Sequence, residues 1–584
     1  MDRIRKEARE VLQRSPWNRP TVLESALSAR LSLAQLWEDV STHDNSTRLN
    51  ICESLYAALS FVDLGYDTML SDDGGPAPLN MADATALSNL LQWASHHARP
   101  SSEFAVDFDD HAEIAEDQKI AQEESRLKSE IAVELILILG AKPVNGLQDR
   151  SIIKSPGVIA TMASFTSKED PWITQTSMDS AETHINVSCQ SGIWPIIERV
   201  LREEIRPLFT KTRNPAITSE GRKNLHPMPS APFDGSKIDD STKPWKNTDI
   251  YATSVLSWAI SQYQPTDKAH LEAHFPLLVP AILSLIDDSS ITFKAKGCHL
   301  LVKLLKPIQE SGSDILLRTN LVSVFQEAVT ACLLSLPSIT PEESSIQILG
   351  AAYPALLALL KAAYQPTLNN QKPSQLEKNR EAYLTNLTKI LRSHLIPSFH
   401  HISFSTPASA TTSASFPYPR LSTFLLGWIS TFCSELKIHT TKYLQDIVPV
   451  LYTTLSNPFG TAHLPLLSAA VSTTRAVILN AHPRVWKWRG ELLGGLAACW
   501  LHVVTDTQSE NRKKGKSSGL KRELQSAVFA LKHALQNPVS VVGETPDPDQ
   551  QAAKEGIEDE LLALVEADAA LEGLLFPKAD GFKS

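Results

Sequence analysis

The sequence predicts an all-α protein, organised as a HEAT-like helical-repeat α-solenoid with long flexible insertions. Its 584 residues exceed what one hydrophobic core usually serves, so the chain forms several domains or an elongated repeat array. Only 23 glycines occur beside 36 prolines, whereas sheet proteins need many glycine-rich turns. Leucine- and alanine-rich segments with helical spacing recur between the loops, and the hydrophobic share of 42% is enough to build cores.

Composition divides the chain into five regions. Residues 1–208 show helical patterns throughout. Residues 209–248 combine proline, glycine and charge without periodicity, which predicts a flexible linker. We expect central HEAT-like repeats at residues 249–402, a second linker at 403–418, and C-terminal HEAT-like repeats at 419–584 with disordered insertions near 507–520 and 543–555.

One predicted repeat turn is especially clear. Apolar residues recur at helical spacing on both sides of the sequence DDSS, so two helices meet at residues 287–290. Pro280, Asp288, Phe293 and Lys294 match the proline, aspartate, apolar and basic positions of a HEAT repeat. Asp288 can cap the second helix, and Lys294 can pair with an aspartate at the turn. We therefore interpret this carboxylate as structural rather than as part of an acid–base pair, because neighbouring carboxylates point apart.

The sequence contains no recognisable set of catalytic residues. The sequence GKSS at Gly515 ends like a phosphate-binding loop, but Glu510 stands where that loop needs a glycine. The histidine doublets at residues 96–97 and 400–401 lack companions at metal-ligand spacing, and the six cysteines form no CxxC pair. We expect no enzyme activity, no cofactor and no metal, and cysteines that are reduced core residues.

Charge and hydropathy favour proteins as partners. A net charge of −10 offers no large basic surface for phosphates, so direct nucleic-acid binding is not expected. The apolar stretches IAVELILILGA and ILGAAYPALLALL are shorter than a membrane-spanning helix, and the N-terminus shows no secretion signal. We expect a cytoplasmic protein, with the nucleus as a second location. The basic run at residues 512–522 is a nuclear localisation signal or, by the favoured interpretation, a solvated linker.

The segment HPRVWKWRGELLGGLAACWLHVV, residues 482–504, contains the candidate partner-binding residues. Two apolar stripes follow its helix, and Arg489 falls between them, where an arginine needs a paired acid or an interface with another chain. Tryptophan and arginine are common interface anchors. The candidates are Arg484, Trp486, Arg489 and Trp500. For the tryptophans the favoured interpretation is nevertheless a place in the core, and the competing interpretation of Arg489 is a pair with an acid on an adjacent repeat.

Several blocks between Pro244 and Val504 together resemble the Tel-two-interacting protein two family. They are PWK followed by SWAISQ, HFPLLVPAILSLIDDSSITFKAKGCHLLVKLL, LSNPFGTAHLPLL, and HPRVWKWRGELL with ACWLHV. The resemblance implies a non-enzymatic HEAT-like scaffold, the smallest subunit of the triple-T cochaperone complex. Such a subunit binds the other triple-T subunits and helps phosphatidylinositol-3-kinase-related kinases reach the ninety-kilodalton heat-shock chaperone for folding and assembly.

Two other classes stay open on the residues alone. Another HEAT-repeat adaptor, such as a nuclear transport receptor or a phosphatase scaffold, would also be an acidic solenoid, although more regular repeats would then be expected. An enzyme is the weakest alternative, since no catalytic motif set is present.

Overall fold

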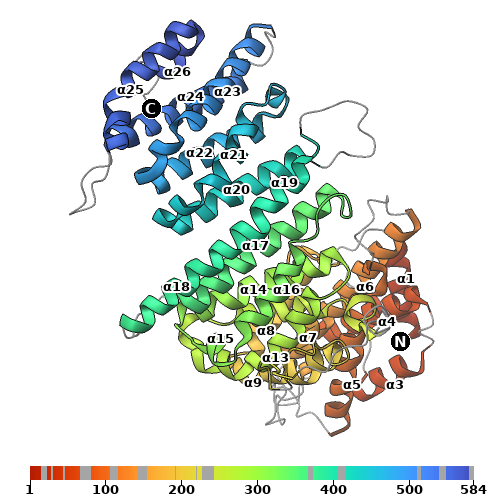
Figure 1. Cartoon of the computed structure of the whole chain (residues 1–584). Coiled ribbons are helices and arrows are strands. Elements are labelled where there is room, and N and C mark those ends of the chain that lie inside the picture. The colour runs from red at the N-terminus through yellow and green to blue at the C-terminus, as the bar shows by residue number, and fades with distance from the viewer. Residues whose placement is uncertain are drawn as a thin grey trace. The chain divides into compact units, whose positions relative to one another are not determined.

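Helices make up nearly all of the regular structure that the computed structural model contains (Figure 1). The described residues are 1–14, 23–27, 31–43, 47–65, 81–105, 116–141, 154–190, 192–218, 220–226, 242–365, 373–404, 416–509, 514–537 and 548–577. Within these ranges the β structure is limited to one isolated antiparallel bridge between Ile217 and Lys223. The predicted all-α class is thus confirmed.

The chain divides into two compact units, of which the first comprises residues up to Val329. Its helices are α1 (Asp2–Arg14), α2 (Glu24–Leu27), α3 (Leu33–Thr42), α4 (Arg48–Ser60), η1 (Phe61–Gly65), α5 (Met81–Ala98), η3 (Ser102–Phe104), α6 (Glu116–Ala141), α7 (Pro156–Ala163), α8 (Gln175–Ser188), α9 (Trp194–Arg199), η4 (Val200–Ile205), α10 (Arg206–Phe209), α11 (Pro244–Asn247), α12 (Ala252–Ser261), η7 (Pro265–Asp267), α13 (Lys268–Ile286), α14 (Ile291–Glu310) and α15 (Ile315–Arg318).

The second unit begins at Thr330, within α16 (Leu321–Cys332). Its further helices are α17 (Glu342–Tyr364), α18 (Pro373–Ile390), η8 (Leu391–Leu395), α19 (Ile396–Phe404), α20 (Pro419–Leu436), η9 (Lys437–Tyr443), α21 (Leu444–Leu455), η10 (Gly460–His463), α22 (Leu464–Val485), η11 (Trp486–Trp488), α23 (Arg489–Ser509), α24 (Lys514–Gln536), α25 (Pro548–Ala567), η12 (Ala569–Leu571) and α26 (Glu572–Leu575).

Local sequence explains where several helices begin. Ser32 and Thr174 each accept a hydrogen bond from the backbone N–H three residues later and form capping boxes at the starts of α3 and α8. Ser155 caps α7, with Pro156 in the first turn, where a missing backbone N–H is harmless. Inside α22 the backbone of Ala481 is not helical, two residues before Pro483, so this proline bends the helix there.

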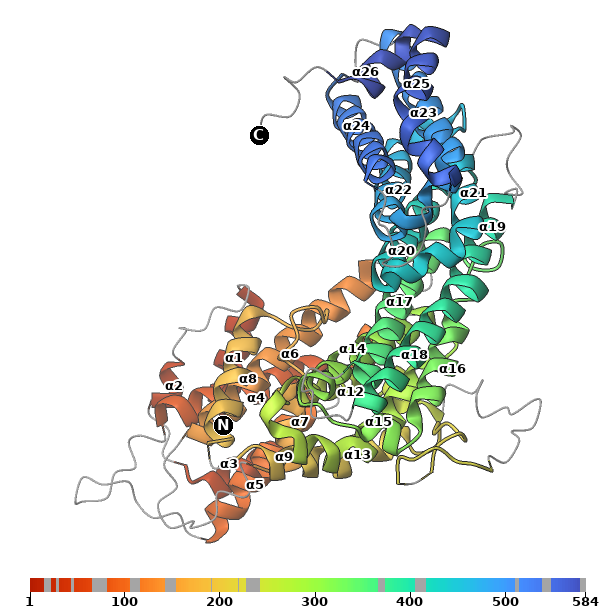
Figure 2. The same ribbon diagram turned by 60° about the vertical axis from the view of Figure 1, so that its left-hand side comes forward.

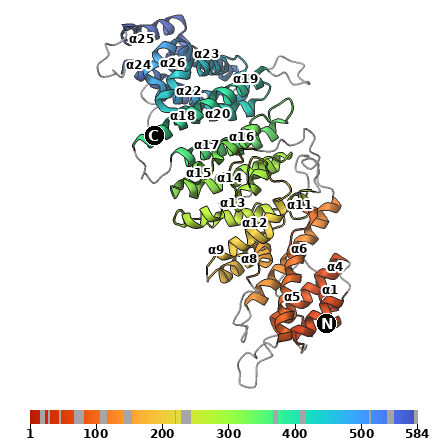
Figure 3. The ribbon, with the colours of Figure 1, turned by 60° about the horizontal axis from the view of Figure 1, so that its bottom comes forward.

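Neighbouring helices pack face to face within each unit. In the first unit, α14 packs against both α13 and α12 (Figure 3). The approach of α14 to α13 is close at Gly297, where an added Cβ would lie 2.8 Å from the backbone nitrogen of Ile286. In the second unit, α22 packs between α20 and α24, while α21 packs against α23 (Figure 2). The apolar stripes predicted from sequence therefore face one another across adjacent helices.

Part of the predicted linker 209–248 is packed against the first unit. The Ser284 hydroxyl donates to the Thr212 carbonyl at 3.0 Å, and the Lys223 N–H donates to the Thr319 carbonyl at 3.0 Å. Gly221 has a φ of +63°, and a Cβ there would lie 2.7 Å from the Pro276 Cα. Periodicity did not reveal this docking, because the contacts are made by backbone groups. The remaining stretch, residues 227–241, lies outside the described residues.

The predicted linker at residues 403–418 and the two predicted C-terminal insertions fall partly outside the described residues. Residues 405–415 of the linker 403–418 lie outside the described ranges, as do residues 510–513 and 538–547. Helix α25 begins at Pro548, inside the second predicted insertion, and α24 begins at Lys514, inside the first. Residues 514–520 and 548–555 of the two predicted insertions are therefore helical, while the division into five regions stays a prediction.

Three helical stretches are long and apolar enough to cross a membrane by length and composition alone: Pro265–Ile286, Glu342–Tyr364 and Gly460–Asp506. The expectation that every apolar stretch is too short is wrong by this measure, because the helices continue beyond the apolar runs. Of the most apolar window in each stretch, 67%, 67% and 44% respectively is buried inside the protein. Much of this apolar surface thus serves packing between helices.

Candidate partner-binding site

The DDSS turn is tied to a segment far away in sequence. Helix α13 ends at Ile286, α14 begins at Ile291, and the side chain of Asp288 is fully buried between them. Its Oδ1 accepts a hydrogen bond from the Ser290 N–H at 2.8 Å, and its Oδ2 lies 2.7 Å from the Lys243 Nζ. Lys246 Nζ lies 4.0 Å from the same carboxylate. The aspartate therefore joins the turn to the PWK segment that precedes α12.

The partner of Asp288 differs from the one expected. The recorded ion pair is with Lys243 rather than with Lys294, whose side chain is half-buried on α14. The residue that directly precedes α14 is Ser290, and its side chain makes no capping hydrogen bond. Asp288 bonds the N–H two residues later, so it shapes the turn ahead of the helix rather than capping the helix itself.

Aromatic packing holds the same two segments together. Trp245 is fully buried, stacks on Phe209 with ring centroids 5.4 Å apart, and meets Phe293 edge to face at 5.1 Å. Phe293 thus has the apolar role predicted for it, with Trp245 as its neighbour. Pro280 lies inside α13 and is half-buried. These contacts assign the turn residues to packing, with the PWK segment as the missing part of the cluster.

Arg489 has its acid within the chain. Its guanidinium Nη2 donates to Glu560 Oε1 at 2.9 Å, and its Nη1 donates to the Trp486 carbonyl at 3.1 Å. The bond to Glu560 raises the already high pKa of the guanidinium. The side chain is 32% exposed. The structure therefore contains the alternative weighed from sequence, in which an acid from an adjacent helix, here α25, neutralises the arginine.

Trp500 is buried and makes its contacts within the chain. It is 6% exposed, and its Nε1 donates to the Ala570 carbonyl at 2.9 Å. A Cβ on Gly573 would lie 3.1 Å from the indole ring, so the glycine permits this close approach. The assignment of Trp500 to a partner surface is corrected accordingly, because its ring and its donor are both covered by the chain's own C-terminal helices.

Two of the four candidate partner-binding residues have side chains that are exposed or half-buried. Arg484 is exposed near the end of α22, and Trp486 is half-buried at the start of η11. The Lys487 ammonium lies 5.0 Å from the centroid of the Trp486 ring, within cation–π range. This arrangement presents an aromatic ring and basic groups together, which are residue types common at interface anchors.

The remaining titratable groups show the effects of burial. All six cysteines are free, and burial raises the pKa of Cys52 to about 11 and those of Cys433 and Cys499 to about 12, which keeps these thiols protonated. Burial lowers the pKa of His97 to about 4, and His401 bonds the Pro337 carbonyl at 2.7 Å. Among the described residues, no group of three or more His, Cys, Asp or Glu side chains could hold a metal ion.

The fold and these sites define a class of helical protein whose distinctive residues serve packing between helices. A family model described as the Tti2 family matches residues 158–462, just over half of the chain. The chain therefore belongs to the Tti2 family, the Tel-two-interacting protein 2 family, as its sequence blocks indicated. This is a family of non-catalytic subunits of a cochaperone complex, and membership implies a role linked to the triple-T complex and to its other subunits.

Proposed function

We propose that the chain is a scaffold subunit of the triple-T cochaperone complex. In this role it binds the other triple-T subunits and supports the folding, stability and assembly of phosphatidylinositol-3-kinase-related kinases with the ninety-kilodalton heat-shock chaperone. Family membership over residues 158–462 carries the proposal. The contacts of that region support it. Lys243, Trp245 and Asp288 join one helical segment to another through an ion pair and ring packing.

The proposal includes a HEAT-like solenoid as the scaffold. Within the second unit, α20, α22 and α24 follow one another as neighbours, and α21 and α23 pack together beside them. A helix pair that cannot bury its apolar face alone shares a core with the next pair, and an extended surface remains for partners. The packing of α14 against α13 across the Asp288 turn is one such pair in the first unit. The expected cytoplasmic location, with the nucleus as a second site, fits this role and stays part of the proposal.

We place one contact with a triple-T partner at Arg484 and Trp486. The indole ring is half-buried, the arginine is exposed, and Lys487 adds a second cation at the ring. Such a site suits an apolar or aromatic partner residue flanked by a carboxylate. Arg489 is not included in this contact, because its guanidinium is already bonded to Glu560 and to the Trp486 carbonyl.

Reconstitution from purified subunits tests this assignment. The full chain is mixed with the largest triple-T subunit, and affinity is measured for wild type, Arg484→Ala, Trp486→Ala and the control Arg199→Ala. Arg199 is a half-exposed arginine on the first unit, at the end of α9, and its ion pair among the described residues is with Glu203 of η4. We expect about tenfold weaker binding for the two site variants, with unchanged unfolding midpoints, and no change for the control. Unaltered affinity in both site variants would reject the surface, and failure of the wild-type chain to bind would reject the role.

A further inference from the structure

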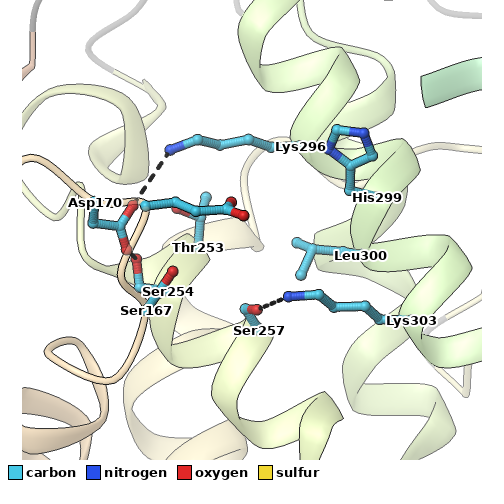
Figure 4. A pocket seen from close by; sticks show the side chains of 10 residues that line it. Ser167, Asp170, Thr253, Ser254, Ser257, Lys296, His299, Leu300 and Lys303 are labelled. Carbon is cyan, nitrogen blue, oxygen red and sulfur yellow. Dashed lines mark hydrogen bonds and ion pairs between the residues drawn. The ribbon is translucent and has the colours of Figure 1, made fainter. Parts of the chain in front are cut away.

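A polar pocket opens on the first unit, inside the family-matched region. It lies between α12, α14 and the loop that joins α7 to α8, and it encloses about 70 Å³ (Figure 4). It is lined by side chains that carry hydroxyl, carboxylate, imidazole and ammonium groups: Ser167, Glu169, Asp170, Thr253, Ser254, Ser257, Lys296, His299, Leu300 and Lys303. The space is sufficient for one carboxylate with part of its side chain.

One carboxylate in the pocket is already satisfied. Asp170 accepts a hydrogen bond from the Ser254 hydroxyl, and its Oδ1 lies 4.0 Å from the Lys296 Nζ (Figure 4). Its side chain is only 9% exposed, whereas that of Lys296 is 37% exposed. Asp170 and Lys296 thus form an internal pair at one wall, which leaves the other cations of α14 available.

The opposite wall presents donors. The Lys303 ammonium donates to the Ser257 Oγ at 2.8 Å (Figure 4). Because the lysine occupies a lone pair of that oxygen, the Ser257 hydroxyl proton is free to point at an incoming acceptor. Lys303 has two further N–H donors of its own, and within the described part of the chain no acid lies within ion-pair distance of it.

The donors of the pocket wall continue along α14 to Lys306, which does not line the pocket. His299, Lys303 and Lys306 are all exposed and follow one another at spacings of four and three residues, so they share one face of the helix. Among the described residues, no ion pair is recorded for Lys306 either. Lys303 and Lys306 therefore give a chain with a net charge of −10 a small local basic face. Burial lowers the pKa of His299 and Glu169 lies near it, so the two lysines carry the positive charge of this face.

We infer that this pocket and the basic face of α14 bind an acidic segment of a partner protein, with one glutamate or aspartate side chain entering the pocket. The carboxylate would accept from the Lys303 ammonium and the Ser257 hydroxyl, and a further acid of the segment would face Lys306. Charge complementarity gives this choice of partner. Nucleic acid is disfavoured, because the few cations here sit on an acidic chain.

Glu169 provides a diagnostic for the sign of the ligand. It lines the pocket as an exposed carboxylate with no ion pair recorded within the described residues. An acidic ligand is repelled by Glu169, so its neutralisation should strengthen binding, whereas a basic ligand would be weakened by the same change. Opposite effects at Glu169 and Lys303 therefore distinguish a specific acidic ligand from a general loss of folding.

The test uses the full chain and a short capped alanine-based peptide with glutamate at every helical turn, with binding followed by fluorescence anisotropy at low and physiological ionic strength. We expect Lys303→Gln, which can keep a hydrogen bond to Ser257, to weaken binding about tenfold. Glu169→Gln should strengthen it about two- to fivefold. The control Lys389→Gln removes an exposed lysine of α18 in the second unit and should leave affinity unchanged.

Several results would overturn the inference. They are no binding of the peptide by the wild-type chain, equal affinities for Lys303→Gln and Lys389→Gln, and weaker binding for Glu169→Gln. Equal or tighter binding of a single-stranded oligonucleotide of matched charge would show that the face attracts any polyanion. The experiment contains no triple-T subunit, so its outcome is independent of the proposed scaffold role.

Discussion

Replacing Asp288 with asparagine should destabilise the first unit strongly. Asparagine has nearly the same shape and keeps an oxygen for the Ser290 N–H, but it removes the negative charge 2.7 Å from the Lys243 Nζ. The Lys243 side chain is 5% exposed, and Lys246 lies near the same carboxylate. The variant therefore leaves buried ammonium groups without the carboxylate that neutralises them.

The magnitude separates two interpretations of this turn. Removing one partner of a buried ion pair costs about 3–5 kcal/mol, and we expect the lower end because both lysines have further interactions. A lost helix cap, the effect predicted from the sequence, costs about 0.5–2 kcal/mol. Asp288→Ala should lower the free energy of unfolding by about 1–3 kcal/mol more than Asp288→Asn, because alanine also leaves the Ser290 N–H without its acceptor.

Urea unfolding at neutral pH measures these changes. Circular dichroism follows the helices, and tryptophan fluorescence follows all eleven tryptophans together, including the buried Trp245 beside the turn. A double-mutant cycle with Lys243→Met isolates the pair, and the double variant should recover at least about 1 kcal/mol of the summed losses. The reasoning is refuted if Asp288→Asn unfolds within about 1 kcal/mol of wild type, or if the two substitutions are additive.

Three further changes have defined outcomes. Gly297→Ala should destabilise by about 1–3 kcal/mol in urea unfolding because the new methyl meets the α13 backbone, whereas Gly427→Ala, with open space around it, should stabilise by about 0.5–1 kcal/mol. Burial holds the pKa of His97 near 4, below its ordinary 6.5, so the unfolded chain binds the extra proton. The free energy of unfolding therefore keeps its full value with respect to this group above pH 6.5 and decreases as the pH falls towards 4. His97→Gln should remove about 1–2 kcal/mol of that pH dependence, after allowance for solvent screening. Arg489→Ala should lower the thermal midpoint of the second unit at least as much as Glu560→Gln, because it also removes the bond to the Trp486 carbonyl, and it should leave affinity for the largest triple-T subunit unchanged. Reduced affinity at an unchanged midpoint would instead restore Arg489 to the interface.

Helical periodicity was enough to predict the fold class and the turn at residues 287–290. Apolar spacing on each side of DDSS is a local property, and the helices end and begin within a few residues of it. The partner of Asp288 was not predictable in this way, because Lys243 is 45 residues earlier in a segment without periodicity. Buried charges raise the question of a partner, but only the folded chain shows which lysine supplies it.

The C-terminal candidates show the same limit. The sequence identified Arg489 as a charge in an apolar setting and left two outcomes open. Its partner Glu560 is 71 residues later, on α25, which packs on α24 and reaches η11. For Trp500 the core was the favoured interpretation and an interface was the alternative, and only the folded chain shows Ala570 and Gly573 against its ring. The pocket around Lys303 was missed altogether, although the spacing of His299, Lys303 and Lys306 on one face was visible in the sequence.

Affinity purification of the tagged full chain from cell extract, with quantitative mass spectrometry, tests the scaffold role most directly. We expect the other triple-T subunits in amounts equal to the chain, accompanied by smaller amounts of phosphatidylinositol-3-kinase-related kinases and of the ninety-kilodalton heat-shock chaperone. Recovery of nuclear transport cargo or of phosphatase catalytic subunits, without the other triple-T subunits, would contradict the proposed role.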